Sequence, residues 1–136
     1  MIGSDAPAGV KENCLDAAVV ATTGFSGGAE KYIANLYSAL SRRGHRVGLL
    51  GRLKPWTAQI GPSVDIHSGP KWSLRTLGPG LVRLARERSG LQLALAQVDA
   101  KVFHLHFKRE QITFTPLLAR KRPVVWTEHG RFPGGL

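Results

Sequence analysis

The chain of 136 residues is poor in cysteine and in acidic residues, and it contains no long apolar run. Its single cysteine, Cys14, cannot form an internal disulfide, so a reducing compartment and a plain packing role for this thiol are expected. The apolar run 15–21 is too short to cross a bilayer, and residues 1–13 lack the apolar core of a secretory signal. We therefore expect a cytoplasmic protein whose first 13 residues are flexible.

Two nucleotide-binding motifs are also missing. A G-x-G-x-x-G motif would need glycine where Ser26 and Ala29 stand, and Gly51-Arg52 occupies the place of a ribose-binding acid. No Gly-Lys-Ser/Thr follows the glycines, which excludes a P-loop. The sequence thus argues against a nicotinamide dinucleotide and against a P-loop triphosphate site.

The charge is strongly positive, with 19 Lys and Arg against 9 Asp and Glu. A formal charge of +10 can attract nucleic acid, an anionic membrane surface or a phosphorylated substrate. The cations are scattered and carry no interleaved aromatic residues of the kind that stack on bases, so no nucleic-acid partner is expected. Peripheral contact with an anionic membrane stays open.

Short apolar runs alternate with longer helical patterns, which is typical of a parallel sheet with crossover helices. We predict one α/β domain over 1–136, with a Rossmann-like, open, mostly parallel sheet and helices on both faces. Strands are expected at 17–23 (central, being apolar on both faces), 46–50, 64–67, 101–106 and 123–128. Helices are expected at 31–43, 81–89, 91–97 and 110–120, the first with Tyr32, Ile33, Leu36, Tyr37 and Leu40 on its apolar face and the last interrupted near Pro116. Residues 51–62 are expected to form a loop.

The most informative stretch is a glycine-rich turn between the strand 17–23 and the helix that follows it. Gly27 and Gly28 lack a Cβ, so the main chain can approach a ligand closely, and the backbone N–H groups of a helix N-terminus favour an anion. This pattern predicts binding of a phosphate-bearing ligand, although a plain tight turn fits the glycines too. Glu30 has two readings of equal weight, a ligand contact or an ordinary first-turn acid favoured by the helix dipole.

Two further segments follow strands and are expected at the same edge of the sheet, where open parallel sheets bind ligands. His104 and His106 share one face of their strand because strand residues alternate sides. For His106 a hydrogen-bonded structural role is the favoured interpretation, whereas a functional role is favoured for His129 beside Thr127 and Gly130.

The three histidines of that edge also resemble a zinc triad, since imidazoles at i and i+2 can chelate from one strand. No clear carboxylate partner or hydrolytic motif accompanies them, so a metal site is not expected.

The runs 27–47, 102–107 and 124–130 together resemble the N-terminal domain of family 4 glycosyltransferases. The resemblance implies a GT-B enzyme in which the N-terminal Rossmann-like domain holds the acceptor and a C-terminal domain holds a nucleotide sugar. Such enzymes transfer the sugar with retention of configuration and generally without a metal or other cofactor. By position, Gly27 and Gly28 match the loop near the donor diphosphate, and His129 matches the histidine near the reacting centre.

In the same resemblance His104 and His106 match a pair on the fourth strand. From their own positions at the strand ends and the helix N-terminus, Thr127, Gly130 and Glu30 complete the expected substrate-binding set. The C-terminal donor domain is not within these 136 residues, so the resemblance implies a chain that is inactive alone and needs that domain or a partner chain. The alternative from another class is a non-catalytic module that binds a phosphorylated metabolite or docks a protein.

Overall fold

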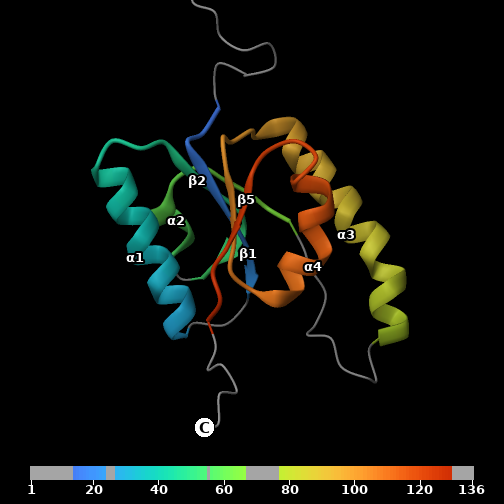
Figure 1. Ribbon diagram of the computed structural model, residues 1–136. Coiled ribbons are helices and arrows are strands. Elements are labelled where there is room, and N and C mark those ends of the chain that lie inside the picture. The colour runs from blue at the N-terminus through green and yellow to red at the C-terminus, as the bar shows by residue number, and fades with distance from the viewer. Residues whose placement is uncertain (1–13, 24–26, 55, 67–76, 130–136) are drawn as a thin grey trace, which may run out of the picture.

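A computed structural model describes residues 14–23, 27–54, 56–66 and 77–129. These residues form a five-stranded, all-parallel sheet with strand order β3-β2-β1-β4-β5 (Figure 1). The predicted α/β class is confirmed, and β1 lies at the centre of the sheet as expected. The elements are β1 (Ala17–Thr23), α1 (Gly28–Arg42), β2 (Val47–Leu53), α2 (Thr57–Ile60), β3 (Ser63–Val64), α3 (Leu77–Gln97), β4 (Phe103–Leu105), α4 (Lys108–Leu118) and β5 (Val124–Trp126).

Helices cover both faces of the sheet, with α1 and α2 on one side and α3 and α4 on the other (Figure 1). Strand β1 contributes to both cores because successive side chains point to opposite faces. Val19 and Ala21 pack with α1, whereas Ala18 and Val20 pack with α3 and α4. All four side chains are fully buried, which explains why this strand carries no polar residue before Thr22.

Helix α1 is amphipathic and buries Ile33, Ala34 and Tyr37 against the sheet. It ends at Arg42, and Gly44 then adopts a φ of +89° that suits glycine. The prediction that Tyr32 belongs to the buried face is wrong, because its side chain is 49% exposed. Tyr32 therefore remains available for contacts outside the core.

Strand β2 is longer than predicted, and the expected loop 51–62 contains the end of this strand and helix α2. Gly51 lies inside β2 with a φ of +117°, and a Cβ at this position would lie 2.0 Å from the carbonyl oxygen of Ala21. The glycine thus permits close approach of two neighbouring strands rather than ending one of them. The short strand β3 stops at Val64, while His67 lies outside the described residues.

The prediction of two helices within 81–97 is wrong, because α3 runs without a break through Gly90. Burial of Leu91, Ala94 and Leu95 outweighs the modest helix cost of one glycine, about 1 kcal/mol. Helix α4 likewise continues past Pro116 to Leu118, so the predicted interruption is absent from it. Phe114 and Leu118 are buried on either side of the proline and hold the last turn in place.

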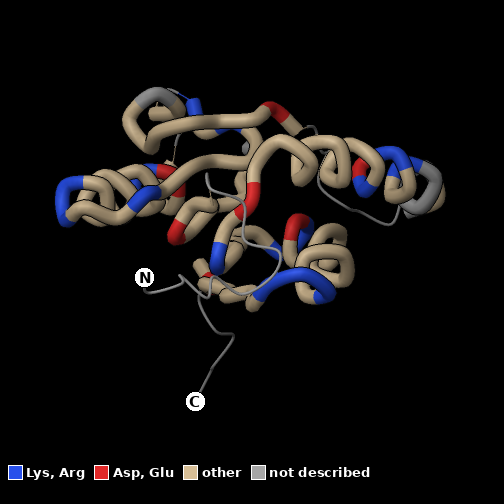
Figure 2. The backbone as a smooth tube through the Cα atoms, turned by 90° about the horizontal axis from the view of Figure 1, so that it is seen from above, with Lys and Arg blue, Asp and Glu red and all other residues tan. Residues whose placement is uncertain are grey.

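Positive charge is spread over separate parts of the described chain, as Figure 2 shows in blue. Cations lie at the end of α1, along α3 and in the turn after α4, with no single continuous stripe. Within the part of the chain that the structure describes, no helix is both long and apolar enough to pass through a bilayer.

Candidate functional site

The candidate site lies at the edge of the sheet where the strands end. Because every strand is parallel, the carboxyl ends of β1, β4 and β5 share this edge, and α1 and α4 begin there (Figure 1). His104 lies in β4, His106 directly follows it, and Thr127 and His129 directly follow β5. The structure thus brings two predicted segments together, while Gly130 falls outside the described residues.

His104 is a fully engaged, partly buried imidazole. Its Nε2 lies 2.6 Å from Oγ1 of Thr127, and its Nδ1 lies 3.2 Å from the hydroxyl of Tyr37. Burial raises the pKa of Tyr37, so its O–H stays protonated and can donate to Nδ1. Burial, together with the nearby His129, lowers the pKa of His104. His104 is therefore a neutral group that fixes Thr127 at the end of β5.

His106 and His129 form a direct imidazole pair. Nδ1 of His106 lies 2.7 Å from Nε2 of His129, with the ring centroids 5.0 Å apart and the ring planes inclined by 22°. His106 is only 2% exposed, whereas His129 is open to solvent. Burial first, and then the neighbouring His104 and His129, lower the pKa of His106 to about 3. Any contact between this pair and a ligand must therefore be made by His129.

Tyr32 links these histidines to helix α1. Its ring meets His129 edge-on at 5.4 Å between centroids and His106 at 6.3 Å. The helix that follows the glycine turn thus packs on the imidazole pair through its second turn. The sequence interpretation placed Tyr32 in the core and missed this contact, which joins segments far apart in the chain.

The glycine turn is stabilised by an acid from its own helix. The carboxylate of Glu30 accepts a hydrogen bond from the backbone N–H of Gly27 at 3.0 Å, and Glu30 is buried. A Cβ on Gly27 would lie 2.9 Å from this oxygen, so glycine makes room for the carboxylate. Of the two readings of Glu30, the geometry supports the first-turn acid. An incoming anion at Gly27 would have to displace it, while Gly28 is exposed with open space around its Cα.

A second buried carboxylate, which sequence reasoning missed, anchors the carboxyl end of β1. Glu110, in the first turn of α4, accepts hydrogen bonds from the Oγ1 of Thr22 at 2.6 Å and from its N–H at 3.3 Å. Arg109 donates to the same hydroxyl at 3.2 Å. Since 88 positions separate Thr22 from Glu110, no local pattern could reveal the pairing.

The geometry disfavours a zinc ion between the paired histidines. Two imidazole nitrogens on one tetrahedral zinc lie about 3.3 Å apart, given bond lengths of about 2.0–2.1 Å. The nitrogens of His106 and His129 are closer than this and share a hydrogen bond instead. Among the residues that the structure describes, no group of three or more suitable side chains could hold a metal ion.

Comparison with known proteins gives one informative result. Residues 26–136 match the model of Glycosyltransferase Family 4, a segment that covers the glycine turn, both histidine segments and most of the sheet. No curated protein and no solved structure matches the chain. The chain belongs to glycosyltransferase family 4.

Proposed function

We propose that this chain is the acceptor-binding half of a retaining glycosyltransferase. In this proposal a nucleotide sugar is the donor, a C-terminal domain or a partner chain binds it, and no metal takes part. The family match supports the transferase class. His129 is the proposed catalytic residue, and Gly28, Thr127 and Gly130 are proposed to lie around the substrates.

The proposal rests on the position of His129, whose exposed ring is held in place by neighbouring side chains. Its ring is open to solvent, yet it is hydrogen-bonded to buried His106 and meets Tyr32 edge-on. A side chain held this firmly at the carboxyl edge of a parallel sheet is suited to contact a substrate in a fixed orientation.

The expected chemistry follows from the charge that develops in the reaction. The bond between the sugar and the diphosphate breaks, and negative charge accumulates on the departing phosphate oxygen while an acceptor hydroxyl attacks. A hydrogen-bond donor near these oxygens stabilises the transition state more than the ground state. Exposed Lys31 and Lys108, in the first turns of α1 and α4, add positive charge beside the same edge.

The alternative function, a module that binds a phosphorylated metabolite, is less favoured because a carboxylate already binds the glycine turn. That function would depend on the N–H groups of the turn, and Glu30 already accepts from Gly27. The carboxylate also places a negative charge where the phosphate would enter.

A labelled-transfer assay tests the proposal. The chain is incubated with radiolabelled uridine, guanosine and adenosine diphosphate sugars and a mixed glycan and lipid acceptor extract, alone and expressed with whatever coding sequence follows Leu136. We expect transfer, with the anomeric configuration retained, only when a donor-binding domain is present. Transfer by the 136-residue chain alone would overturn the two-domain arrangement. Absence of transfer in both arms, with a phosphorylated metabolite bound instead, would favour the binding module.

A further inference from the structure

The environment of one nitrogen of buried His106 determines which nitrogen of His129 carries the proton. Nε2 of His106 is buried and has no hydrogen-bond partner among the described residues. The nearest imidazole, that of His104, lies 4.0 Å away between centroids, but Thr127 and Tyr37 occupy both of its nitrogens. Among the described residues, His106 therefore forms a hydrogen bond through Nδ1 alone.

A hydrogen bond between two neutral imidazoles needs one N–H and one bare nitrogen. If Nδ1 of His106 were the bare acceptor, its proton would sit on Nε2 and leave a buried N–H without an acceptor. An unsatisfied buried donor costs about 1–3 kcal/mol. If Nδ1 carries the proton, the buried Nε2 has a lone pair that accepts no hydrogen bond. Proteins tolerate such a buried acceptor more readily than a buried N–H without an acceptor.

The second arrangement fixes the state of His129 as well. Nδ1–H of His106 then donates to Nε2 of His129, so neutral His129 must hold its own proton on Nδ1. Nε2 of His129 is occupied within the pair, which leaves Nδ1 as the nitrogen that a ligand can reach. That nitrogen carries a hydrogen and can donate, but it cannot accept a proton.

We propose that His106 is a positioning residue that holds His129 as its Nδ1–H tautomer, so that His129 meets the substrate as a hydrogen-bond donor through Nδ1–H and not as a general base. The role toward a substrate rests on the proposed transferase function, whereas the tautomer itself does not. A donor of this kind suits the departing phosphate oxygen, which gains negative charge as the bond to the sugar breaks. It does not suit removal of a proton from the acceptor hydroxyl.

Tyr32 restrains the relative orientation of the His106 and His129 rings. Its edge-on contacts with both rings restrict rotation of His129 about its side-chain bonds, and Phe107 lies 6.2 Å from the outer ring between centroids. The rings that surround the pair are thus those of Tyr32, Phe107 and His104.

Nuclear magnetic resonance of the chain, labelled with ¹⁵N in histidine, tests the tautomer directly. Long-range ¹H–¹⁵N correlation at about pH 8.5, where ordinary histidines are neutral, distinguishes a protonated Nδ1 from a protonated Nε2. We expect His129 to be protonated on Nδ1. The substitution His106→Phe keeps a ring but removes the donor, so His129 should shift to the Nε2–H form that free histidine prefers in water. The substitution His106→Asn places an amide N–H near the position of Nδ1 and should retain the wild-type tautomer.

His45→Phe, in the exposed turn before β2, is the matched control and should leave the His129 signals unchanged. A wild-type His129 protonated on Nε2 overturns the proposal, as does an Nδ1–H tautomer that survives in a folded His106→Phe variant. If His106→Phe fails to fold, the wild-type and His106→Asn spectra still decide the matter. Should the tautomer be as expected while His129→Ala leaves sugar transfer intact, the proposed catalytic role of His129 fails, whereas the control of its tautomer by His106 stands.

Discussion

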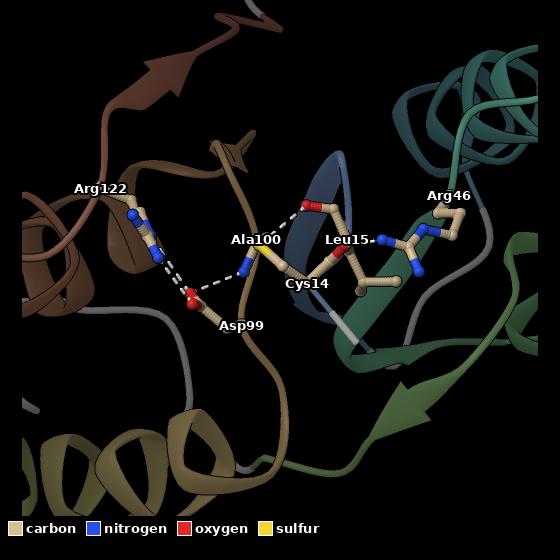
Figure 3. A network of polar contacts seen from close by, with 6 residues as sticks. All are labelled: Cys14, Leu15, Arg46, Asp99, Ala100 and Arg122. Carbon is tan, nitrogen blue, oxygen red and sulfur yellow. Dashed lines mark hydrogen bonds and ion pairs between the residues drawn. The ribbon is translucent and has the colours of Figure 1, made fainter. Parts of the chain in front are cut away.

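The two ends of the sheet differ in the kinds of polar residue that they bring together. At the amino end, Figure 3 shows Arg122 bound to the carboxylate of Asp99, with an N–O distance of 2.8 Å, and Arg46 donating to the carbonyl of Cys14 at 2.7 Å. The Asp99 carboxylate also accepts from the N–H of Ala100 at 2.9 Å. These charges join segments that are distant in sequence, and their hydrogen-bonding capacity is directed at the chain itself.

The same end carries a second ion pair, in which Lys101 lies 3.0 Å from Asp16. The pKa of Asp16 is lowered, mainly because the backbone N–H of Arg46 donates to it and then because of Lys101. Cys14 is buried there and donates weakly to the carbonyl of Leu15, in keeping with its predicted packing role. These polar contacts thus join different parts of the chain and stabilise the fold.

The carboxyl end instead contains neutral imidazoles beside an exposed aromatic ring, and buried carboxylates bind Thr22 in β1 and Gly27 before α1. Burial at this end suppresses charge on His104 and His106 rather than pairing it. We expect the amino end to contribute mainly to stability and the carboxyl end to contain the proposed substrate contacts. Variants at the two ends should therefore differ in which measurement they change.

The largest effect on stability is expected for Glu110→Ala. The variant leaves the hydroxyl and N–H of Thr22 without their buried acceptor, a loss of about 2–3 kcal/mol in the free energy of unfolding. Urea unfolding measures this change. A loss below about 0.5 kcal/mol, the usual range for surface substitutions, would show that the carboxylate does not hold the turn.

Stability should next depend on pH through the buried imidazoles. Below the ordinary histidine pKa of about 6.5 the unfolded chain binds a proton, whereas folded His106, with its pKa near about 3, does not. Unfolding free energy should therefore fall on acidification from about pH 6.5 to 4.5, by up to about 1.4 kcal/mol per pH unit for this residue. His104 acts in the same direction.

The variant His106→Asn provides the control, because it removes the titrating ring while His104, His129 and Tyr32 stay in place. Its unfolding free energy should vary less with pH over the same interval. Parallel pH profiles for the wild type and the variant would contradict the assignment.

A smaller effect is expected for Glu30→Gln, which removes the charge from the cap on Gly27. Loss of a helix cap of this kind costs about 0.5–2 kcal/mol, and the amide should retain part of the hydrogen bond. The variant should also bind inorganic phosphate or a nucleoside diphosphate more tightly than the wild type, since the competing negative charge is gone. Unchanged or weaker anion binding, measured by calorimetry, would mean that the turn is not an anion site.

The smallest effect is expected at the amino end, for Lys101→Ala. Its ammonium is exposed, and surface ion pairs contribute little. The midpoint of thermal unfolding and the rate of sugar transfer should both remain within experimental error of the wild type. A marked loss of transfer would show that the two ends are not separate in function.

The sequence was sufficient to predict the architecture because the determining signals are local. Apolar β1 and the amphipathic face of α1 specify their own structure, and the alternation of elements indicates a parallel sheet. The breaks expected at Gly90 and Pro116 were wrong because burial of neighbouring side chains overrides local helix propensity.

The candidate site was predictable only in part. Because the carboxyl ends of parallel strands lie at the same edge of a sheet, the sequence places His106 and His129 at one edge. Their direct hydrogen bond depends on the strand order and on the turn after β5. The contacts of Tyr32 and Glu110 join segments far apart in the chain, and a single sequence carries no information on such pairs.

The central claim is that His129 at the carboxyl end contacts the reacting groups, and the most direct test compares two histidines in the active transferase. His129→Ala should lower kcat/KM by more than about tenfold, the loss expected for one well-placed polar contact, while the fold measured by circular dichroism is unchanged. His45→Ala, at an exposed turn of the amino end, should leave kcat/KM within experimental error of the wild type. Equal rates for the two variants, both close to wild type, would contradict the account.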